Sequence, residues 1–189
     1  MSNPLFSKFS TPHQTCPFTQ LKTDHFLPAF EKGLTEAKAD IEKISSSTKP
    51  ASFENTIEAL EFSGNLLSRV SSVFFNLNSA ETSDEIQKIA QEISPKLSAH
   101  ANDVSLNKAL FQRIKALFEQ KDELDLTFEQ NQLLEKNYKS FTRNGANLSE
   151  SDQDKLRQID QTLAKLKLEF GEHVLAANNA FELLVSDEN

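Results

Sequence analysis

Apolar residues recur at helical spacing over long stretches of this chain, and few glycines or prolines interrupt them. The clearest series lies near the C-terminus and comprises Leu156, Ile159, Leu163, Leu166, Phe170, Val174 and Ala177. Steps of three or four residues place these side chains on one face of an α-helix. The 189 residues include only four Gly and six Pro, and strong helix formers such as Leu, Ala, Glu and Lys separate them. The pattern therefore predicts an all-α fold.

The same periodicity predicts about six helices. We expect them from Asp24 to Ser45, from Phe53 to Asn78, after Thr82 or Ser83, through Leu106 to Leu117, from Thr127 to Thr142, and after Ser149. The second and sixth are the longest, at roughly 40 Å each for a rise of 1.5 Å per residue. Short connections favour antiparallel neighbours, so we expect an antiparallel helical bundle with the Leu156 series facing its interior.

Local signals mark where several of these helices begin and end. Expected N-caps are Ser52, Thr82 with Glu85, Thr127 with Gln130, and Ser149 with Asp152. Side-chain oxygens of such residues accept hydrogen bonds from the free amides of a first helical turn. Pro95 lies inside the third apolar pattern and predicts a kink near Gln91 to Ser94. Asn144 and Gly145 predict a C-terminal stop, because both tolerate positive φ.

Both ends of the chain depart from the helical pattern. Residues 1–22 contain three prolines and little periodicity. They predict an extended arm over the helices, pinned by Leu5, Phe6, Phe9 and Phe18, or else a disordered tail. Residues 181–185, FELLV, form the single strand-like run, and one strand has no sheet to join. We therefore divide the chain into an arm (1–22), a helical domain (23–180) and the start of a second structural unit (181–189).

Charge and composition exclude several functions. A formal net charge of −8 argues against binding to nucleic acid or to an anionic membrane surface, since both need clustered Lys and Arg. The longest uncharged apolar stretch, Val70 to Ala80, is too short to span a bilayer. Cys16 is the one cysteine, so no intrachain disulfide forms, and the N-terminus lacks the pattern of a secretory signal. These features predict a cytoplasmic protein.

Residues able to carry catalysis are few and scattered. The histidines are His13, His25, His100 and His173, and no two are spaced to share a helix face, so we expect surface or capped histidines rather than metal ligands. Cys16 lies beside Pro17 in the arm, with His13 as a weak candidate base, and we do not expect an activated nucleophile. Four isolated glycines, Gly33, Gly64, Gly145 and Gly171, form no phosphate-binding loop.

Three further groups of residues have a structural and a functional interpretation. The carboxylate pairs Glu54 and Glu58, Asp122 and Glu123, and Asp152 and Asp154 are typical of solvated helix faces. Phe74 and Phe75 could line a ligand pocket, but their apolar neighbours favour core packing. The run Asn76 to Ser79 could line a substrate channel through its amides, and we favour a simple helix C-terminus. We therefore assign no catalytic, cofactor-binding or metal-ligating residue in this chain.

Several strings nevertheless resemble one enzyme family. They are NPLFSKFSTPHQTCPF, HFLPAFEKGL, SFENTIEALEFSGNLLSRVSSVFFNLNSAETSDE, EISPKLSAHANDVSLN, LLEKNYKSFTRNGANLSE and EFGEHVLAANNAFELLVSDE. Together they resemble the N-terminal region of bacterial peptidyl-dipeptidases (dipeptidyl carboxypeptidases). Those zinc metallopeptidases are grouped with oligopeptidase A and thimet oligopeptidase. The core SGNLLSRVSSVFF favours the dipeptidase branch.

The resemblance implies a longer, mostly helical enzyme with a deep channel that admits short peptides and releases dipeptides from their C-termini. In that family the zinc is held by a His-Glu-x-x-His helix and a more distant Glu, and the Glu between the two His is the general base. No position in this chain matches that motif. The resemblance thus implies that these helices form one channel wall and pack on a catalytic portion that binds the zinc. We expect the 189 residues alone to be inactive and to expose apolar surface where that portion packs.

Two alternatives remain open at this point. The chain could be the N-terminal domain of an oligopeptidase A-like endopeptidase, which cuts inside peptides. It could also be a stand-alone helical interaction module that holds a partner helix in a groove.

Overall fold

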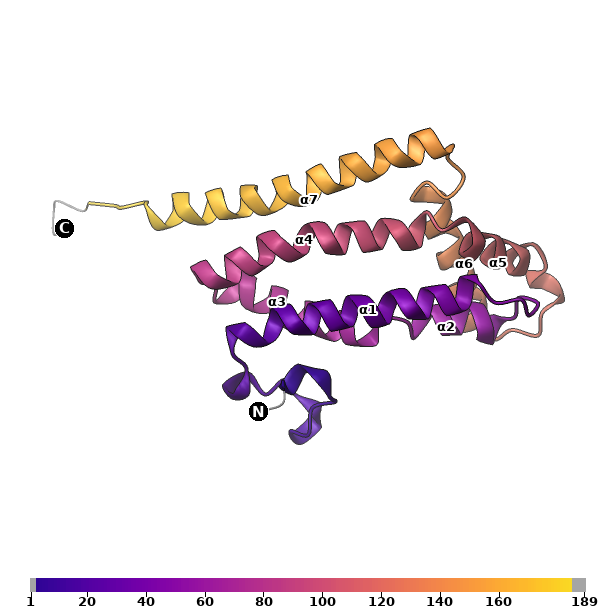
Figure 1. Cartoon of the computed structure of the whole chain (residues 1–189), viewed down its shortest axis with the longest axis horizontal. Coiled ribbons are helices and arrows are strands. Elements are labelled where there is room, and N and C mark those ends of the chain that lie inside the picture. Colours follow the sequence, from indigo (N-terminus) through magenta and orange to yellow (C-terminus); the bar gives the residue numbers. More distant parts are fainter. Residues whose placement is uncertain (1–2, 185–189) are drawn as a thin grey trace, which may run out of the picture.

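The computed structural model describes residues 3–184, and its regular structure in that range is helical throughout (Figure 1). The six helices of 12 or more residues are α1 (Phe26–Ser45), α3 (Asn65–Ala80), α4 (Asp84–Ser105), α5 (Lys108–Glu119), α6 (Phe128–Arg143) and α7 (Glu150–Asn179). Helices α1 and α4 run from left to right in Figure 1, and α3 and α7 run from right to left. The predicted all-α antiparallel bundle is confirmed, and its division into three units stays a prediction.

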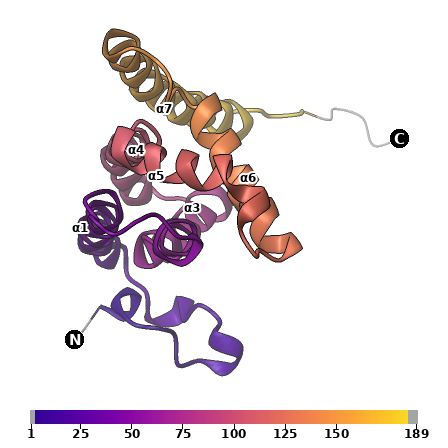
Figure 2. The same ribbon diagram turned by 90° about the vertical axis from the view of Figure 1, so that its right-hand side faces the viewer.

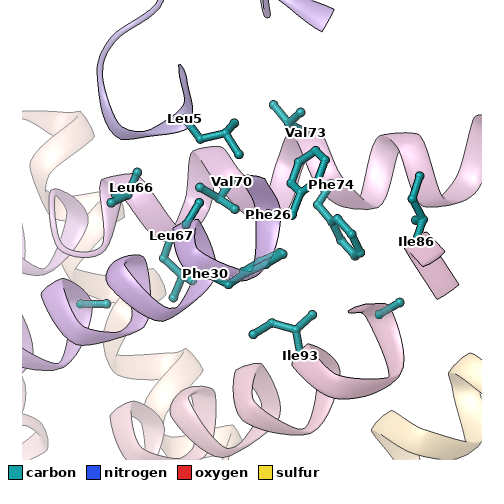
Figure 3. Packing of buried hydrophobic residues seen from close by; sticks show 13 residues of the cluster. Leu5, Phe26, Phe30, Leu66, Leu67, Val70, Val73, Phe74, Ile86 and Ile93 are labelled. Carbon is teal, nitrogen blue, oxygen red and sulfur yellow. The ribbon is translucent and has the colours of Figure 1, made fainter. Parts of the chain in front are cut away.

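A cluster of phenylalanine rings forms the centre of the first hydrophobic core, between α1, α3 and α4 (Figure 3). The ring of Phe74 lies 5.2 Å from the ring of Phe26 and 5.2 Å from that of Phe30, edge to face in both cases. All three side chains are buried, and Phe75 packs beside them. Aromatic rings favour this geometry because the positive edge of one meets the negative face of another. The core interpretation of Phe74 and Phe75 is confirmed.

The closest approach of two helices in this core occurs at Gly33 of α1. A Cβ atom built on Gly33 would lie 3.0 Å from the Cα and 3.1 Å from the backbone nitrogen of Leu67 in α3. A hydrogen side chain therefore lets the two backbones touch. This crossing fixes the separation of α1 and α3, and hence the width of the space that the phenylalanine rings fill.

The predicted helix from Phe53 to Asn78 is interrupted, so the expected 40 Å rod is wrong. Phe53–Glu58 is a π-helical turn, α2 (Ala59–Glu61) adds one turn, and α3 begins only after Gly64. Gly64 adopts a left-handed conformation with φ of 63°, which L-residues with side chains rarely adopt. Its amide donates a hydrogen bond of 3.1 Å to Oδ2 of Asp40 in α1. The glycine and this bond together end one helix and start the next.

The expected N-caps are mostly confirmed. The side chains of Ser52, Thr127 and Ser149 each accept a hydrogen bond from a backbone amide of the following turn. The capping box expected at Thr82 is wrong, because Ser83 Oγ accepts from the Ile86 amide instead. Helix α4 contains Pro95 and stays helical on both sides of it, and the kink expected just before it stays a prediction. Gly145, with φ of 92°, follows the end of α6 as expected.

A second hydrophobic core joins the C-terminal half of α1 to α5, α6 and the π-helical turn. Within it the rings of Phe118 and Tyr138 stack at 3.9 Å. Arg113 of α5 holds the segment that follows α1 in place through three hydrogen bonds. Its Nη1 donates to the carbonyl oxygens of Ser47 and Lys49, at 3.0 and 2.9 Å, and its Nη2 donates to Oδ1 of Asn55 at 2.7 Å.

Residues 3–22 of the N-terminal arm lie against α1 and α3. Leu5 is fully buried in the first core, and Phe9 packs at its edge. Arg69 of α3 donates a hydrogen bond of 2.9 Å to the Leu5 carbonyl oxygen, and its guanidinium lies over the ring of Phe9. Phe18 is exposed, so it does not act as the anchor that the sequence suggested. At the other end, residues 181–184 form no strand, and Val185 lies outside the described residues.

Adding one methyl group at Gly33 should destabilise the protein because it would press on the backbone of Leu67. We expect Gly33→Ala to lower the free energy of unfolding by roughly 1–3 kcal/mol, the usual cost of overpacking. Gly171→Ala is the matched control, because no atom lies within 4 Å of its added Cβ. There alanine should be neutral or should stabilise the helix by up to about 1 kcal/mol. Urea unfolding followed by circular dichroism measures both, and equal losses would contradict the close-crossing account.

Candidate functional site

Helix α7 lies at the edge of the bundle, with α4 as its main neighbour (Figure 2). Two polar pairs connect α7 to α4. Arg157 Nη1 donates to Oδ1 of Asp103 at 2.8 Å, and Gln91 Nε2 donates to the carboxylate of Glu172 at 3.0 Å. Leu168 adds an apolar contact to the first core. Exposed pairs of this kind contribute little stability.

The face of α7 that the sequence predicted to be buried is exposed. Five of its residues form what we call the α7 stripe: Ile159, Leu163, Leu166, Phe170 and Val174. Phe170 is 70% exposed and Leu166 is 52% exposed. The predicted inward orientation is wrong because the residues that turn toward α4 are others, including Arg157, Leu168 and Glu172. The periodicity identified the helix correctly and assigned its covered side incorrectly.

A groove of about 640 Å³ lies between the α3–α4 turn and the C-terminal half of α7. Its polar lining residues include Asn78, Ser79, Thr82, Gln87, Lys167 and Glu172, and Leu168 and Leu175 add apolar surface. The sequence offered two interpretations of Asn76 to Ser79. Helix α3 does end here, at Ala80, and Asn78 and Ser79 also line the groove. Amide and hydroxyl groups at such a place can exchange hydrogen bonds with an extended peptide backbone.

The four histidines lie on separate elements. His13 is in a turn of the arm and His25 precedes α1, whereas His100 lies on α4 and His173 on α7. Within residues 3–184, no three His, Cys, Asp or Glu side chains are grouped closely enough to hold a metal ion. The donor groups that the described part of the chain offers therefore do not fit a zinc site, which needs three or four converging ligands.

His100 is the most unusual of the four. Its Nδ1 is buried and has no hydrogen-bond partner among the described residues. Partial burial lowers the pKa of His100 below its usual 6.5, and the positive charge of Lys38 on α1 lowers it further. Asp103, on its own helix, opposes the shift. Because the shift comes from partial burial and from a lysine on another helix, we attribute it to helix packing.

Burial and hydrogen bonding shift the pKa values of Cys16, Glu54 and Asp152. Burial raises the pKa of the Cys16 thiol, which disfavours the reactive thiolate. The pKa of Glu54 is lowered by hydrogen bonds at the start of its own helix, and that of Asp152 is lowered by Lys155 and Ser149. Both carboxylates are exposed. They stabilise helix N-termini, as expected for solvated faces.

The largest pKa shift, at Glu135 of α6, was not predicted from the sequence. Hydrogen bonds from Lys121 and Lys139, at 2.7 and 3.0 Å, together with their positive charges, lower the pKa of Glu135 from 4.5 to about 2. Lys121 lies 14 residues earlier in the chain, and no local spacing signals this contact. The three charges form a surface network that ties α6 to the turn before it.

The described residues thus form a helical bundle in which one long helix has an open apolar face. A family model described as "Neurolysin/Thimet oligopeptidase, N-terminal domain" matches residues 30–155. Residues 30–155 make up more than half of the chain. The chain therefore belongs to the neurolysin/thimet oligopeptidase family and contains its N-terminal domain. The expected family resemblance is confirmed.

Curated relatives agree with this assignment. The chain is 38% identical over 186 residues to dipeptidyl carboxypeptidase from Salmonella typhimurium and 37% identical over 185 residues to that from Escherichia coli. It is 30% identical over 188 residues to oligopeptidase A from Haemophilus influenzae. These alignments cover 98%, 98% and 100% of this chain. The chain spans 27% of the length of each relative. In the described part, no helix is both long and apolar enough to cross a membrane.

The environment of His100 predicts a pH dependence of stability. Between its lowered folded pKa and the ordinary value of 6.5, the unfolded chain binds a proton that the folded protein does not. Unfolding is therefore favoured as the pH falls below 6.5, and the effect levels off below the folded pKa. Melting temperatures between about pH 5 and pH 8 should show this slope. His100→Gln should flatten it, and His173→Gln, at an exposed position on α7, should leave it unchanged. An unaltered slope in His100→Gln would contradict the assignment.

Proposed function

We propose that the complete protein is a zinc metallopeptidase that releases dipeptides from the C-termini of short peptides, with this chain forming one wall of its substrate channel. The observation that carries the proposal is the graded similarity to relatives. Over nearly the same span, identity is 37–38% to two dipeptidyl carboxypeptidases and 26–30% to three bacterial oligopeptidases A. The dipeptidase branch is therefore favoured.

The distribution of chemical groups supports a role in binding and shape. The described residues offer no cluster of metal ligands, so the zinc and its general base are assigned to the part of the polypeptide that corresponds to the other three quarters of the relatives. Zinc in such enzymes activates a water molecule for attack on a peptide carbonyl. The contribution of this chain is the groove beside Asn78, Thr82 and Glu172, whose side chains offer hydrogen-bonding groups. Hydrogen bonds from such groups to a peptide backbone tolerate many side chains.

An oligopeptidase A-like endopeptidase is the second candidate. Its support is the alignment to the H. influenzae oligopeptidase A at 30% identity over all of this chain. A stand-alone interaction module is the third, because the exposed α7 stripe could receive a partner helix. The cytoplasmic location expected from the single cysteine stays a prediction.

Peptide cleavage by two forms of the protein separates these candidates. The complete polypeptide should release a C-terminal dipeptide from an N-blocked tripeptide, and a chelator should abolish the reaction. An otherwise identical peptide with an amidated C-terminus should be a poor substrate, because a dipeptidase recognises the terminal carboxylate. Residues 1–189 alone should show no chelator-sensitive cleavage.

Other outcomes favour the rival functions. Internal cuts in longer peptides, insensitive to C-terminal amidation, would identify an endopeptidase. A reading frame that stops after Asn189, with no peptidase activity, would favour the interaction module. Zinc-dependent cleavage by residues 1–189 alone would overturn the assignment of the chemistry to another part of the polypeptide.

A further inference from the structure

We propose that the α7 stripe is the surface on which an amphipathic helix from the remainder of the same polypeptide packs. This inference rests on the proposed function only in requiring that the polypeptide continues beyond the residues described here. It identifies which surface of the N-terminal domain the rest of the protein covers, and what kind of segment covers it.

The spacing of the stripe suits a partner helix. Its members follow one another at intervals of four, three, four and four residues, from Ile159 to Val174. At 3.6 residues per turn they form a nearly straight apolar line along four turns. Residues that turn toward α4, such as Arg157, Leu168 and Glu172, lie on a different side of α7. Helix α7 therefore has one face that packs on α4 and a second, apolar face that the described residues leave exposed.

The exposure is concentrated at this end of the molecule. Of the fourteen large apolar side chains that are exposed in the described part, nine belong to α7 or to residues 181–184. The stripe supplies five of the nine. Single exposed apolar residues are ordinary on protein surfaces, but a continuous line of them marks an interaction site. Phe170 alone presents an aromatic ring that is 70% exposed, the kind of side chain that anchors interfaces.

The position of the residues that follow α7 favours a covering helix from the same polypeptide. Phe181, Leu183 and Leu184 extend beyond the C-terminal end of α7 (Figure 1) and are 74%, 76% and 91% exposed. The relatives are almost four times as long as this chain, which spans 27% of them. A segment that follows α7 is tethered next to the stripe. Its effective concentration is on the order of millimolar, well above the micromolar concentration of a second molecule.

The flanks of the stripe indicate the chemistry of the occupant. Lys167 and Asp160 border one side, and Lys155 and Glu169 border the other. Both flanks thus carry both signs of charge, so a strongly charged partner gains no advantage. The occupant is a helix with large apolar residues at steps of three and four and with mixed polar flanks. A second copy of α7 has the same pattern, and the experiment below separates the two.

Hydroxyl-radical footprinting of the complete, unsubstituted polypeptide tests the proposal. Phe170 and Phe128 are matched probes, because both are phenylalanines on helices and they are 70% and 74% exposed within this chain. If a helix of the same polypeptide covers the stripe, Phe170 should be oxidised about tenfold more slowly than Phe128, since an interface core excludes solvent. The ratio should not change with protein concentration. Equal rates would overturn the proposal.

Protection of Phe170 that grows with concentration, together with the mass of a dimer, would assign the stripe to a second copy and also overturn it. A substitution gives an independent measurement. Leu166→Glu should lower the melting temperature of the complete polypeptide by several degrees and speed oxidation of Phe170. Gln158→Glu, at an exposed position of α7 off the stripe, should do neither.

Peptide cleavage measured on the same samples keeps this proposal separate from the proposed function. Cleavage with rapid oxidation of Phe170 would reject the covered stripe and leave the peptidase assignment standing. Protection of Phe170 without cleavage would support the covered stripe and reject the peptidase.

Discussion

The contact between Gly33 of α1 and the backbone of Leu67 in α3 is the constraint on which the rest of the structure depends. A Cβ atom at Gly33 would lie only 3.0 Å from the Cα of Leu67. The two helices therefore approach more closely than side chains normally permit. The rings of Phe26, Phe30 and Phe74 then fill the wedge that opens beyond the crossing, at centroid distances of 5.2 Å. Helix α4 and the N-terminal arm close this wedge.

Helix α7 has a different kind of attachment. Burial of apolar surface contributes about 25 cal/mol per Å², and α7 buries little of it, because its largest apolar side chains point away from the bundle. Its ion pairs with Asp103 and Lys108 are exposed and contribute between about 0 and 1 kcal/mol each. A 30-residue helix held in this way depends on what covers its outer face. In a multidomain enzyme, such an element can couple domain packing to the shape of a neighbouring groove.

Much of this fold could be predicted from sequence because the decisive signals are local. The caps at Ser149 and Thr127 act within one turn, and the apolar periodicity of α6 and α7 reports helix directly. Gly64 shows where local reasoning fails. Its neighbours continue a helical pattern on both sides, and the break depends on the Asp40 carboxylate 24 residues away. The network around Glu135 was missed for the same reason, since Lys121 reaches it across a turn.

The α7 stripe shows that periodicity can identify a helix correctly and still assign its buried side incorrectly. Helical periodicity states that one face of a helix will be covered, but it does not state by what. Reading Leu163 and Phe170 as interior residues was wrong for this chain, in which both are exposed. The chain spans 27% of the length of the relative from S. typhimurium. A polypeptide as long as that relative has enough further residues to cover this face. The same residues that gave a wrong orientation within the bundle are therefore the basis for our proposal of where the domain meets the rest of its polypeptide.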